Sequence, residues 1–380
     1  MRNLRALVLT VSLAVVMLFV GMFAVARGDR EELFRALGNL AEVIHLVETE
    51  YVDELNQEAL ALSLDAGIAE SVDRWAAVLA PDQVEQYRQL MASPPPYGLG
   101  LASRLSTAAV RNTVAGSPAA AAGLEPWEVI ELVEGVNTRG RPLWQIRLEL
   151  AGREAAGQPS TLTVLDREVD ERRDVVLEAA PWSPGVGSIA DRDGVRVVTV
   201  ESLGAGAAEQ IARMAAGDEP LVLDLRDLVW GTEEEAVATV DLFVADGTLA
   251  QWQGRRAGSE LYPASPDVVA EVPPVVVVGH DTEWVGEILA AGLQSAGSVL
   301  VGVRTIGHAP MMRLVTDGDI HLWMPVGAWL RADGEPIDGN GVEPDDEVAP
   351  GPSEEADPVL ERAVQLALER STEVALADAA

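Results

Sequence analysis

Apolar and polar positions alternate along the chain in three different ways. From residue 29 to about 93 the period is helical, with apolar side chains at steps of three and four: Leu33, Leu37, Leu40, Val43, Ile44 and Val47. A second helical stretch follows Asn56, and PDQVEQYRQL predicts a short helix with Pro81 in its first turn. The sequence SPPP then marks a boundary.

Beyond that boundary the pattern changes first to strands and then to alternating strands and helices. Residues 97 to about 182 contain the short β-like runs YGLGLASRL, AVRNTV, VIELVEG, TLTVLD and DVVLEA. From about residue 185, strands over VRVVTV, LVLDL, VVVV and VLVGV alternate with helices over AAEQIARMA, EEEAVATVDLFVA and EILAAGLQSA. Valine-rich runs suit strands covered on both faces, so this part predicts an α/β layer. An acidic tail with the amphipathic segment VLERAVQLALE follows Pro350.

The first thirty residues have the pattern of a membrane anchor. Arg2 and Arg5 precede an uncharged stretch from Ala6 to Ala26, and Arg27 follows it. A stretch of about twenty apolar residues is long enough to span a bilayer. We expect residues 1–28 to anchor the chain in a bacterial inner membrane, with the rest exported to the periplasm or extracytoplasmic space. Cleavage after Ala26, which would release a secreted protein, remains an alternative.

Charge and composition exclude several chemistries. The 380 residues include 61 acidic and 27 basic side chains, a formal net charge of −34, which disfavours nucleic-acid binding. The chain contains no lysine and no cysteine, so lysine-based catalysis, disulfides and thiolate chemistry are excluded. The four histidines, His45, His280, His308 and His321, lack the spacing of metal ligands. We therefore predict neither a metal nor a cofactor.

Five motifs in order resemble the C-terminal processing (tail-specific) serine proteases. GSPAAAAGLEPWEVIELVEG looks like the PDZ domain of these exported bacterial proteases, and YGLGL before it resembles a carboxylate-binding loop. The helical stretch from Glu50 to Tyr87 resembles the segment that precedes this domain. LVLDLRDLVWG is similar to the DLRxNxGG strand and loop, and VVVVGHDTEWVGEIL to the nucleophile turn and its helix. DGEPIDGNGVEPDDEV matches the closing G-x-G-[IV]-x-P-D signature, so the resemblance covers roughly residues 30–370.

The resemblance implies an α+β fold. It would contain a helical N-terminal region, a PDZ-like β domain and an α/β protease-like core with the layered sheet and helices of crotonases and Clp proteases. The expected boundaries, in chain order, are an anchor at 1–28, a helical region at 29–95, a PDZ-like domain at 96–182, a core at 183–350 and an acidic helical tail at 351–380.

The family's nucleophile falls on a residue that cannot perform its chemistry. In the family the turn reads SASASE, with the middle serine as nucleophile. Aligning the family glutamate with Glu287 places Thr282, Trp284 and Gly286 at the three serines. The resemblance therefore puts Trp284, which has no nucleophilic atom, at the attacking position.

The family's other catalytic positions are also replaced. Its basic lysine, in a TFGKG loop, corresponds to His308 in TIGHA, and the supporting glutamine corresponds to Met312. In the oxyanion region the glycine pair becomes Trp230-Gly231, and the asparagine of DLRxNxGG becomes Leu228. Because the chain has no lysine, no shifted alignment restores a serine–lysine dyad.

Two interpretations of these positions stay open. In one, His308 fills the space of the lysine, and Trp284 and Trp230 close the former cleft, where Trp284 could also contact a ligand. In the other, His308 acts as a base for Thr282, aided by Glu283 or His280.

The PDZ-like motif is better preserved. Gly98, Leu99, Gly100 and Leu101 form the predicted loop for a terminal carboxylate, with the peptide adding as a strand. A PDZ fold kept only for architecture is the alternative, since the usual Gly-Asp before the central strand is Trp127-Glu128 here.

We therefore expect an exported, membrane-anchored pseudoprotease. It would bind protein or peptide C-termini or an envelope protein, or scaffold a complex. The alternative is an active peptidase that cleaves protein C-termini with Thr282 and His308.

Overall fold

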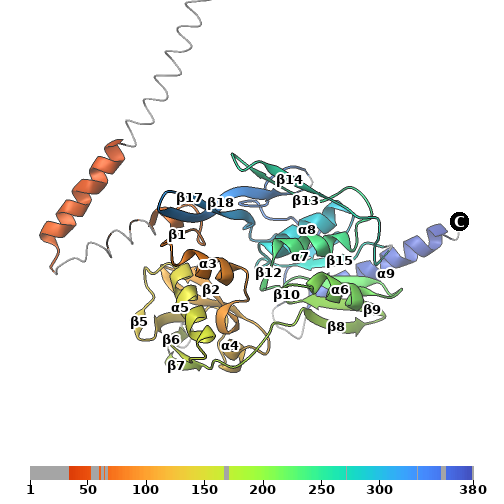
Figure 1. Cartoon of the computed structure of the whole chain (residues 1–380). Coiled ribbons are helices and arrows are strands. Elements are labelled where there is room, and N and C mark those ends of the chain that lie inside the picture. Colours follow the sequence, from red (N-terminus) through yellow and green to blue (C-terminus); the bar gives the residue numbers. More distant parts are fainter. Residues whose placement is uncertain are drawn as a thin grey trace, which may run out of the picture. The chain divides into compact units, whose positions relative to one another are not determined.

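A computed structural model describes residues 34–52, 60, 64, 67–166, 171–270, 272–331, 333–351 and 357–378. The chain divides into two units, residues 1–65 and 66–380 (Figure 1). In the first unit, residues 34–50 form the helix that the spacing predicts, and its apolar side chains Leu37, Val43 and Leu46 are exposed. Within the described ranges, no helix combines the length and apolarity needed to cross a membrane. The predicted anchor, residues 1–28, lies outside the described residues.

The PDZ-like region, residues 96–182, contains one sheet closed by one long helix. Its strand order is β2-β3-β4-β6-β7, with β5 beside β4, and all neighbours are antiparallel. Apolar side chains of the sheet and of the helix α5 share a core. The elements are η1 (Pro96–Gly98), β2 (Leu99–Arg104), β3 (Thr107–Thr113), α4 (Pro118–Ala121), β4 (Val129–Val133), β5 (Val136–Asn137), α5 (Leu143–Ala155), β6 (Ser160–Asp166) and β7 (Glu171–Leu177).

The core, residues 183–350, contains the predicted α/β layer. A six-stranded sheet has the order β19-β16-β15-β11-β9-β8; its neighbours are parallel except for β8 at one edge. The elements are β8 (Gly187–Arg192), β9 (Val195–Val200), β10 (Ser202–Leu203), α6 (Ala207–Ala215), β11 (Leu221–Asp224), β12 (Trp230–Gly231), α7 (Glu233–Asp241), β15 (Val275–Val278), α8 (Val285–Ser295), β16 (Val299–Gly302) and β19 (Asp346–Glu347).

The valine run of β15 explains why this sheet needs two covered faces. Val276 and Val278 belong to the apolar cluster shared with α6, α7 and α8, whereas Val275 and Val277 belong to the cluster shared with α9 (Pro358–Asp378). Successive side chains of a strand point to opposite faces, so a continuous apolar run is stable only between two layers. The amphipathic tail predicted after Pro350 is thus the second layer of the core (Figure 1).

A second sheet of the core was missed by the sequence pattern. It has the order β1-β18-β13-β14, with β17 also paired to β18. Its strands are β1 (Ala77–Leu79), β13 (Thr248–Gly254), β14 (Ser259–Pro263), β17 (Pro310–Asp317) and β18 (Ile320–Leu330). Within the helical region predicted at 29–95, β1 is a strand that the pattern did not show, because Ala77 pairs with Trp323, more than two hundred residues away in the sequence. The short helix predicted next to it is α3 (Val84–Met91).

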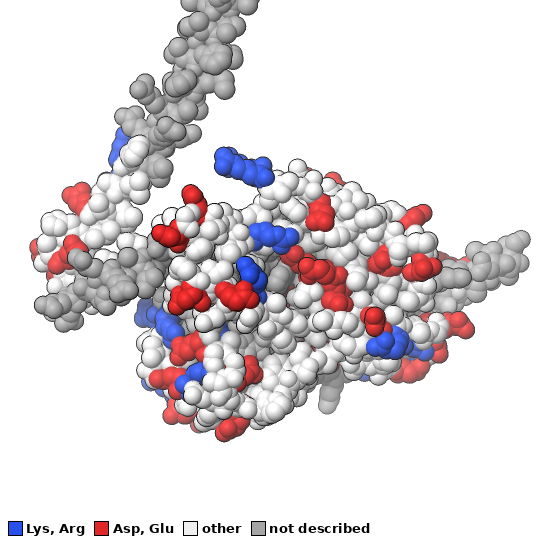
Figure 2. All heavy atoms as spheres, viewed as in Figure 1, with Lys and Arg blue, Asp and Glu red and all other residues white. Residues whose placement is uncertain are grey.

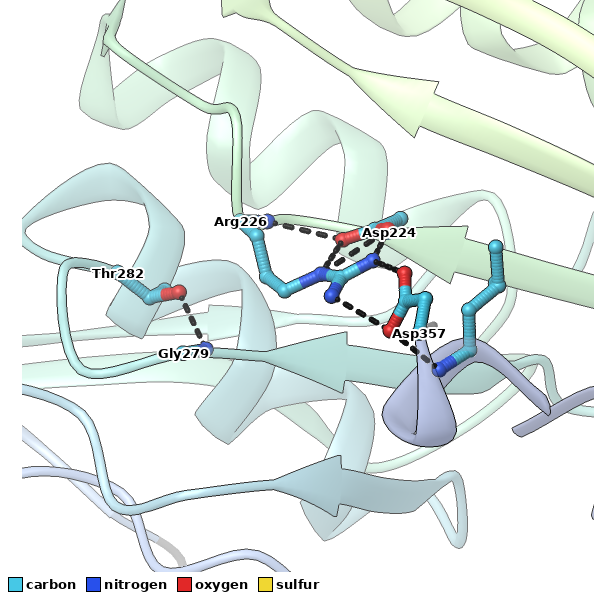
Figure 3. A network of polar contacts seen from close by, with 6 residues as sticks. Asp224, Arg226, Gly279, Thr282 and Asp357 are labelled. Carbon is cyan, nitrogen blue, oxygen red and sulfur yellow. Dashed lines mark hydrogen bonds and ion pairs between the residues drawn. The ribbon is translucent and has the colours of Figure 1, made fainter. Parts of the chain in front are cut away.

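An ion-pair bridge ties the end of β11 to the start of α9 (Figure 3). The Arg226 guanidinium binds the Asp224 carboxylate at 2.6 Å and the Asp357 carboxylate at 2.7 Å. Asp357 also accepts the Leu360 N–H at 3.1 Å and so caps the helix. Burial alone would raise the pKa of Asp357, but the hydrogen bonds and charge of Arg226 outweigh it and lower that pKa. The Asp-Leu-Arg sequence after the strand is therefore accounted for by this bridge.

Candidate functional site

The strand-to-helix turn after β15 keeps the backbone shape of a nucleophile turn. Trp284 is the N-cap of α8, with φ 46° and ψ −108°. A positive φ is strained for a residue with a large side chain, and such strained turns present the nucleophile in α/β hydrolases. The turn thus retains its conformation although the side chain at its tip cannot attack a carbonyl.

Both N–H groups of Trp284 are bound inside the protein. Its backbone N–H donates to the His308 carbonyl at 3.0 Å. Its indole N–H donates to Glu233 Oε1 at 3.3 Å, and the same oxygen accepts the Trp329 indole N–H at 3.3 Å. Burial raises the pKa of the Glu233 carboxyl against these hydrogen bonds. An amide that already donates internally is not free to stabilise an oxyanion.

The ring of Trp284 joins two apolar clusters. It packs against the main core cluster and also against a cluster built from β1, α3 and the α5 residue Trp144. In the second cluster Tyr87 lies edge-on to Trp144 and to Trp323, each with ring centroids 5.8 Å apart. The indole therefore fills space at the meeting point of the core and the PDZ-like region.

Thr282 lies buried within its own turn. Its side chain is only 1% exposed, and its Oγ1 accepts the Gly279 N–H at 3.0 Å (Figure 3). Its methyl group lies so close to Gly286 that a Cβ there would approach it to 2.9 Å. The hydroxyl is thus held as an acceptor that stabilises the turn.

Glu287 fixes the turn to the loop that carries His308. This fully buried carboxylate accepts the Thr305 hydroxyl, the Gly307 N–H at 2.7 Å and the His308 N–H at 2.8 Å. Burial raises the pKa of Glu287, and the three hydrogen bonds act in the opposite direction. Glu287, which set the register of the family comparison, is therefore a positioning residue for the whole site.

The closing signature packs beneath the same loop. Gly307, at φ +77°, would place a Cβ 2.7 Å from the Gly341 nitrogen, and Gly341, at φ +72°, would place one 2.5 Å from the Thr305 carbonyl. The Thr305 hydroxyl accepts the Val342 N–H at 2.8 Å. The glycines of TIGH and GNGV are thus required by close backbone approach.

The His308 ring pairs with Asp73, a residue that the sequence analysis missed. Nε2 lies 2.8 Å from the Asp73 carboxylate, whereas Nδ1 is buried without a hydrogen-bond partner. Burial would raise the pKa of Asp73, but the hydrogen bonds from His308 and the Trp75 N–H, and the charges of His308 and Arg74, lower it overall. No local pattern connects two residues 235 positions apart.

The remaining candidates for a displaced catalytic site have other partners. Glu283 forms ion pairs with Arg111 and with Arg74, the latter at 3.4 Å, and His280 is exposed. In the described part of the chain, no hydrogen bond joins Thr282 to His308. The structure thus places both residues beside one turn without pairing them.

The region that the resemblance aligns with the family's oxyanion site is filled by apolar side chains. Trp230 is 9% exposed, and its ring lies over Gly204, where a Cβ would meet it at 2.7 Å. Gly231 is packed against Leu203 and Val285. The other two replaced positions, Leu228 and Met312, are buried apolar side chains.

The predicted carboxylate loop is partly occupied by the protein itself. The Gly98 N–H donates to the Pro95 carbonyl, and the Leu99 N–H to the Pro96 carbonyl. The preceding Tyr97 N–H donates to the Glu154 carboxylate at 2.9 Å. The other two loop residues, Gly100 and Leu101, lie on β2, which is an edge strand of its sheet. A peptide strand can therefore add along β2, but a carboxylate of the protein already lies beside the loop.

Among the described residues, no cluster of histidine, aspartate and glutamate side chains is suited to hold a metal ion.

Comparisons with known proteins show what this part of the chain is similar to. Residues 195–348 match the model of peptidase family S41. The matched range contains most of the core and the turn that carries Trp284.

Full-length relatives agree with this assignment. The chain is 23% identical over 322 residues to a probable CtpA-like serine protease of Staphylococcus aureus, covering 81% of this chain and 64% of the relative. It is 28% identical over 258 residues to a carboxyl-terminal-processing protease of Picosynechococcus, covering 64% and 61%. The chain thus spans somewhat less than two thirds of the length of these relatives. The predicted resemblance to C-terminal processing proteases is confirmed.

A solved structure shows the same fold. The photosystem II D1 C-terminal processing protease matches with a TM-score of 0.61 and 19% identity, covering 80% of this chain and 84% of that one. The predicted α+β class is confirmed. The match is to the fold, and the roles of individual residues come from the geometry above.

The Asp73–His308 pair predicts a pH-dependent contribution to stability. Because the folded state lowers the pKa of Asp73, the pair stabilises the protein fully above the ordinary carboxyl range, and this contribution is lost as the pH falls through the lowered pKa. Asp73→Asn should reduce the free energy of unfolding by about 2 kcal/mol near pH 7, and by less near pH 3. Urea unfolding at both pH values measures this difference.

The control for Asp73→Asn is a neutralised carboxylate that lies away from the pair and its charged neighbours. Arg74 and Asp338 face it, and Glu287 holds the His308 backbone. Glu85→Gln, on the exposed face of α3, is a matched neutralisation and should change stability little at either pH. An Asp73→Asn effect of equal size at both pH values would contradict the linkage.

Proposed function

We propose that this protein is a catalytically inactive member of the C-terminal processing peptidases that binds peptides or proteins. The observation that carries the proposal is Trp284 at the tip of the nucleophile turn. Its side chain has no nucleophilic atom, and both its N–H groups are used internally. The absence of lysine from the chain removes the family's base as well.

The neighbouring geometry supports loss of catalysis rather than a shift of it. The Thr282 hydroxyl accepts a backbone hydrogen bond, and the His308 ring is held by Asp73. A general base needs to reach the proton that it removes, at about 2.6–3.2 Å or through one water. The Thr282 hydroxyl contacts the Gly279 N–H and the His308 ring contacts Asp73, so these two side chains are not hydrogen-bonded to each other.

The first test is proteolysis of an unfolded substrate. Purified protein incubated with an unfolded polypeptide that ends in apolar residues should release product no faster than buffer alone. Thr282→Ala and His308→Ala should leave this background unchanged. An active C-terminal processing protease, assayed in parallel by mass spectrometry of the products, shows that the substrate can be cleaved.

The second candidate function is a working peptidase with Thr282 as nucleophile and His308 as base. One observation favours it. His308 Nδ1 has no hydrogen-bond partner, so with the proton on Nε2 its lone pair is available to accept a proton. Specific cleavage that is lost in both Thr282→Ala and His308→Ala would replace the pseudoprotease proposal by this one.

The binding surface that we propose is β2 with its carboxylate loop. An edge strand offers backbone groups to an added peptide strand, as in PDZ recognition. Glu154 lies at this loop, bound to the Tyr97 N–H and, at 2.7 Å, to the Trp182 indole N–H. Because its charge repels a second carboxylate, we expect the natural protein to bind free C-termini weakly.

Glu154→Gln should therefore strengthen binding of a peptide with an apolar, free C-terminus by about tenfold, which corresponds to a change of about 1.4 kcal/mol in the binding free energy. The glutamine oxygen still accepts both N–H groups, so the local structure is kept. Fluorescence anisotropy with labelled peptides measures the affinity. A C-terminally amidated peptide, which carries no charge to be repelled, should bind both proteins equally; a gain for that peptide too would argue against the electrostatic account.

We also propose that residues 1–28 anchor the protein in the inner membrane, with the other domains exported. The apolar stretch from Ala6 to Ala26, flanked by arginines, supports this. Expressed in bacteria, the full chain should pellet with membranes and be digested by protease added to spheroplasts, whereas a chain starting at residue 29 should stay in the soluble cytoplasmic fraction. Protection of the full chain from the protease would contradict export.

A further inference from the structure

A cleft of about 500 Å³ lies between the PDZ-like region and the core. One wall comes from the end of β3 and the segment around α4, and it includes Trp127. The other wall comes from the segments that follow β9, β11 and β15, and it includes Glu201, Asp227 and Asp281. The cleft borders the turn that carries Trp284, because Asp281 belongs to that turn, but neither Trp284 nor a residue of β2 lines it. The proposed function does not use this cleft.

The positive charges of this cleft are already neutralised. Arg111 forms an ion pair with Glu283 and donates to the Asp281 carbonyl at 2.6 Å. Arg226 is held by Asp224 and Asp357 in the bridge described above. The two arginines that line the cleft therefore have little charge to offer a ligand.

Its carboxylates are not neutralised. Within the described residues, the side chains of Glu201 and Asp227 make no hydrogen bond or ion pair. Burial and mutual repulsion raise the pKa of Glu201, and burial and the charge of Asp224 raise that of Asp227. The charge of Arg226 acts in the opposite direction at Asp227, but Arg226 is ion-paired to Asp224 and Asp357. A ligand that brings a positive charge of its own is therefore favoured beside Glu201 and Asp227.

An indole completes the lining. Trp127 is 47% exposed, although large apolar rings are normally buried. Its backbone is fixed by the hydrogen bond from its N–H to the Val110 carbonyl at 2.7 Å, at a φ of 71°. A fixed, exposed indole beside unpaired carboxylates is a combination that binds a guanidinium. The flat face of the guanidinium stacks on the indole ring, and its N–H groups donate to the carboxylates.

We propose that this cleft binds an arginine side chain of a partner polypeptide, with the guanidinium against Trp127 and its charge balanced by Glu201 and Asp227. The strongly acidic chain attracts basic partners in general, and Figure 2 shows acidic side chains spread over the face that it draws. The cleft adds a site of defined composition to that general attraction. Partner choice would then depend on an internal basic residue as well as on the C-terminus.

Short labelled peptides with one central arginine test this. Both ends are blocked by acetyl and amide groups, so that the carboxylate loop cannot contribute, and the matched control peptide carries citrulline, which has the same shape without the charge. The arginine peptide should bind the full protein at least about tenfold more tightly than the citrulline peptide, with lysine in between. Equal binding of the arginine and citrulline peptides would overturn the proposal.

Variants locate the site. The double variant Glu201→Gln, Asp227→Asn should lose about tenfold or more in affinity for the arginine peptide, and Trp127→Ala should also weaken it. Both carboxyl groups lack partners, so their removal should leave the thermal midpoint unchanged or higher, which separates lost binding from lost folding. Glu209→Gln, an exposed carboxylate on α6 outside the cleft, is the matched control and should bind as the natural protein does.

Two results would contradict the assignment to this cleft. One is equal loss of affinity in Glu209→Gln and in the double variant, which would show attraction to net charge alone. The other is unchanged affinity in both the double variant and Trp127→Ala. Glu154→Gln should have no effect on these blocked peptides, so failure of the cleft and failure of the β2 site give different patterns.

Discussion

The buried Glu287 carboxylate is the interaction on which the site depends. At the first turn of α8 it accepts three hydrogen bonds from residues 305–308, and so joins the turn after β15 to the loop after β16, the neighbouring strand of the sheet. A buried charge without such donors would be very costly, so the loop has to close on it. These hydrogen bonds explain why the turn, the glycines of the following loop and the closing signature pack closely together. The turn, the loop glycines and the closing signature stabilise the fold whether or not the site performs catalysis.

Around that carboxylate, the two positions that the family resemblance marks as nucleophile and base carry side chains that bind other groups of the protein. Trp284 and Trp329 share the Glu233 carboxylate, and His308 binds Asp73. Indoles provide large apolar area with one N–H that needs an acceptor, and one glutamate supplies it for both. The result is a packed junction between core and PDZ-like region, in which the Trp284 and Trp329 indole N–H groups and His308 Nε2 bind carboxylates of the protein.

The two binding surfaces that we propose lie outside this junction, on β2 and in the cleft with Trp127. The β2 edge keeps its backbone groups, yet Glu154 stands beside the loop that would receive a carboxylate. The cleft with Trp127 differs in the charge that it favours, because its two arginines are ion-paired to other carboxylates and Glu201 and Asp227 are left to a positively charged ligand. A polypeptide with an internal arginine and an uncharged or distant C-terminus suits both surfaces. In both places the selectivity comes from carboxylates, as the composition of −34 net charges would favour.

The sequence by itself determined the helices and the valine-rich strands of the core, because burial on one or two faces leaves a local period. It also determined that no serine–lysine chemistry is available, since that follows from residue identity at Trp284 and His308. It did not predict β1, β17 and β18, whose pairing joins distant segments, nor Asp73 as the partner of His308. Only the tertiary structure decided that Thr282 is locked in its turn, that Glu154 reaches the carboxylate loop, and that Trp127, Glu201 and Asp227 share one cleft. Contacts between residues far apart in the chain leave no periodic signal, because they depend on how the layers pack.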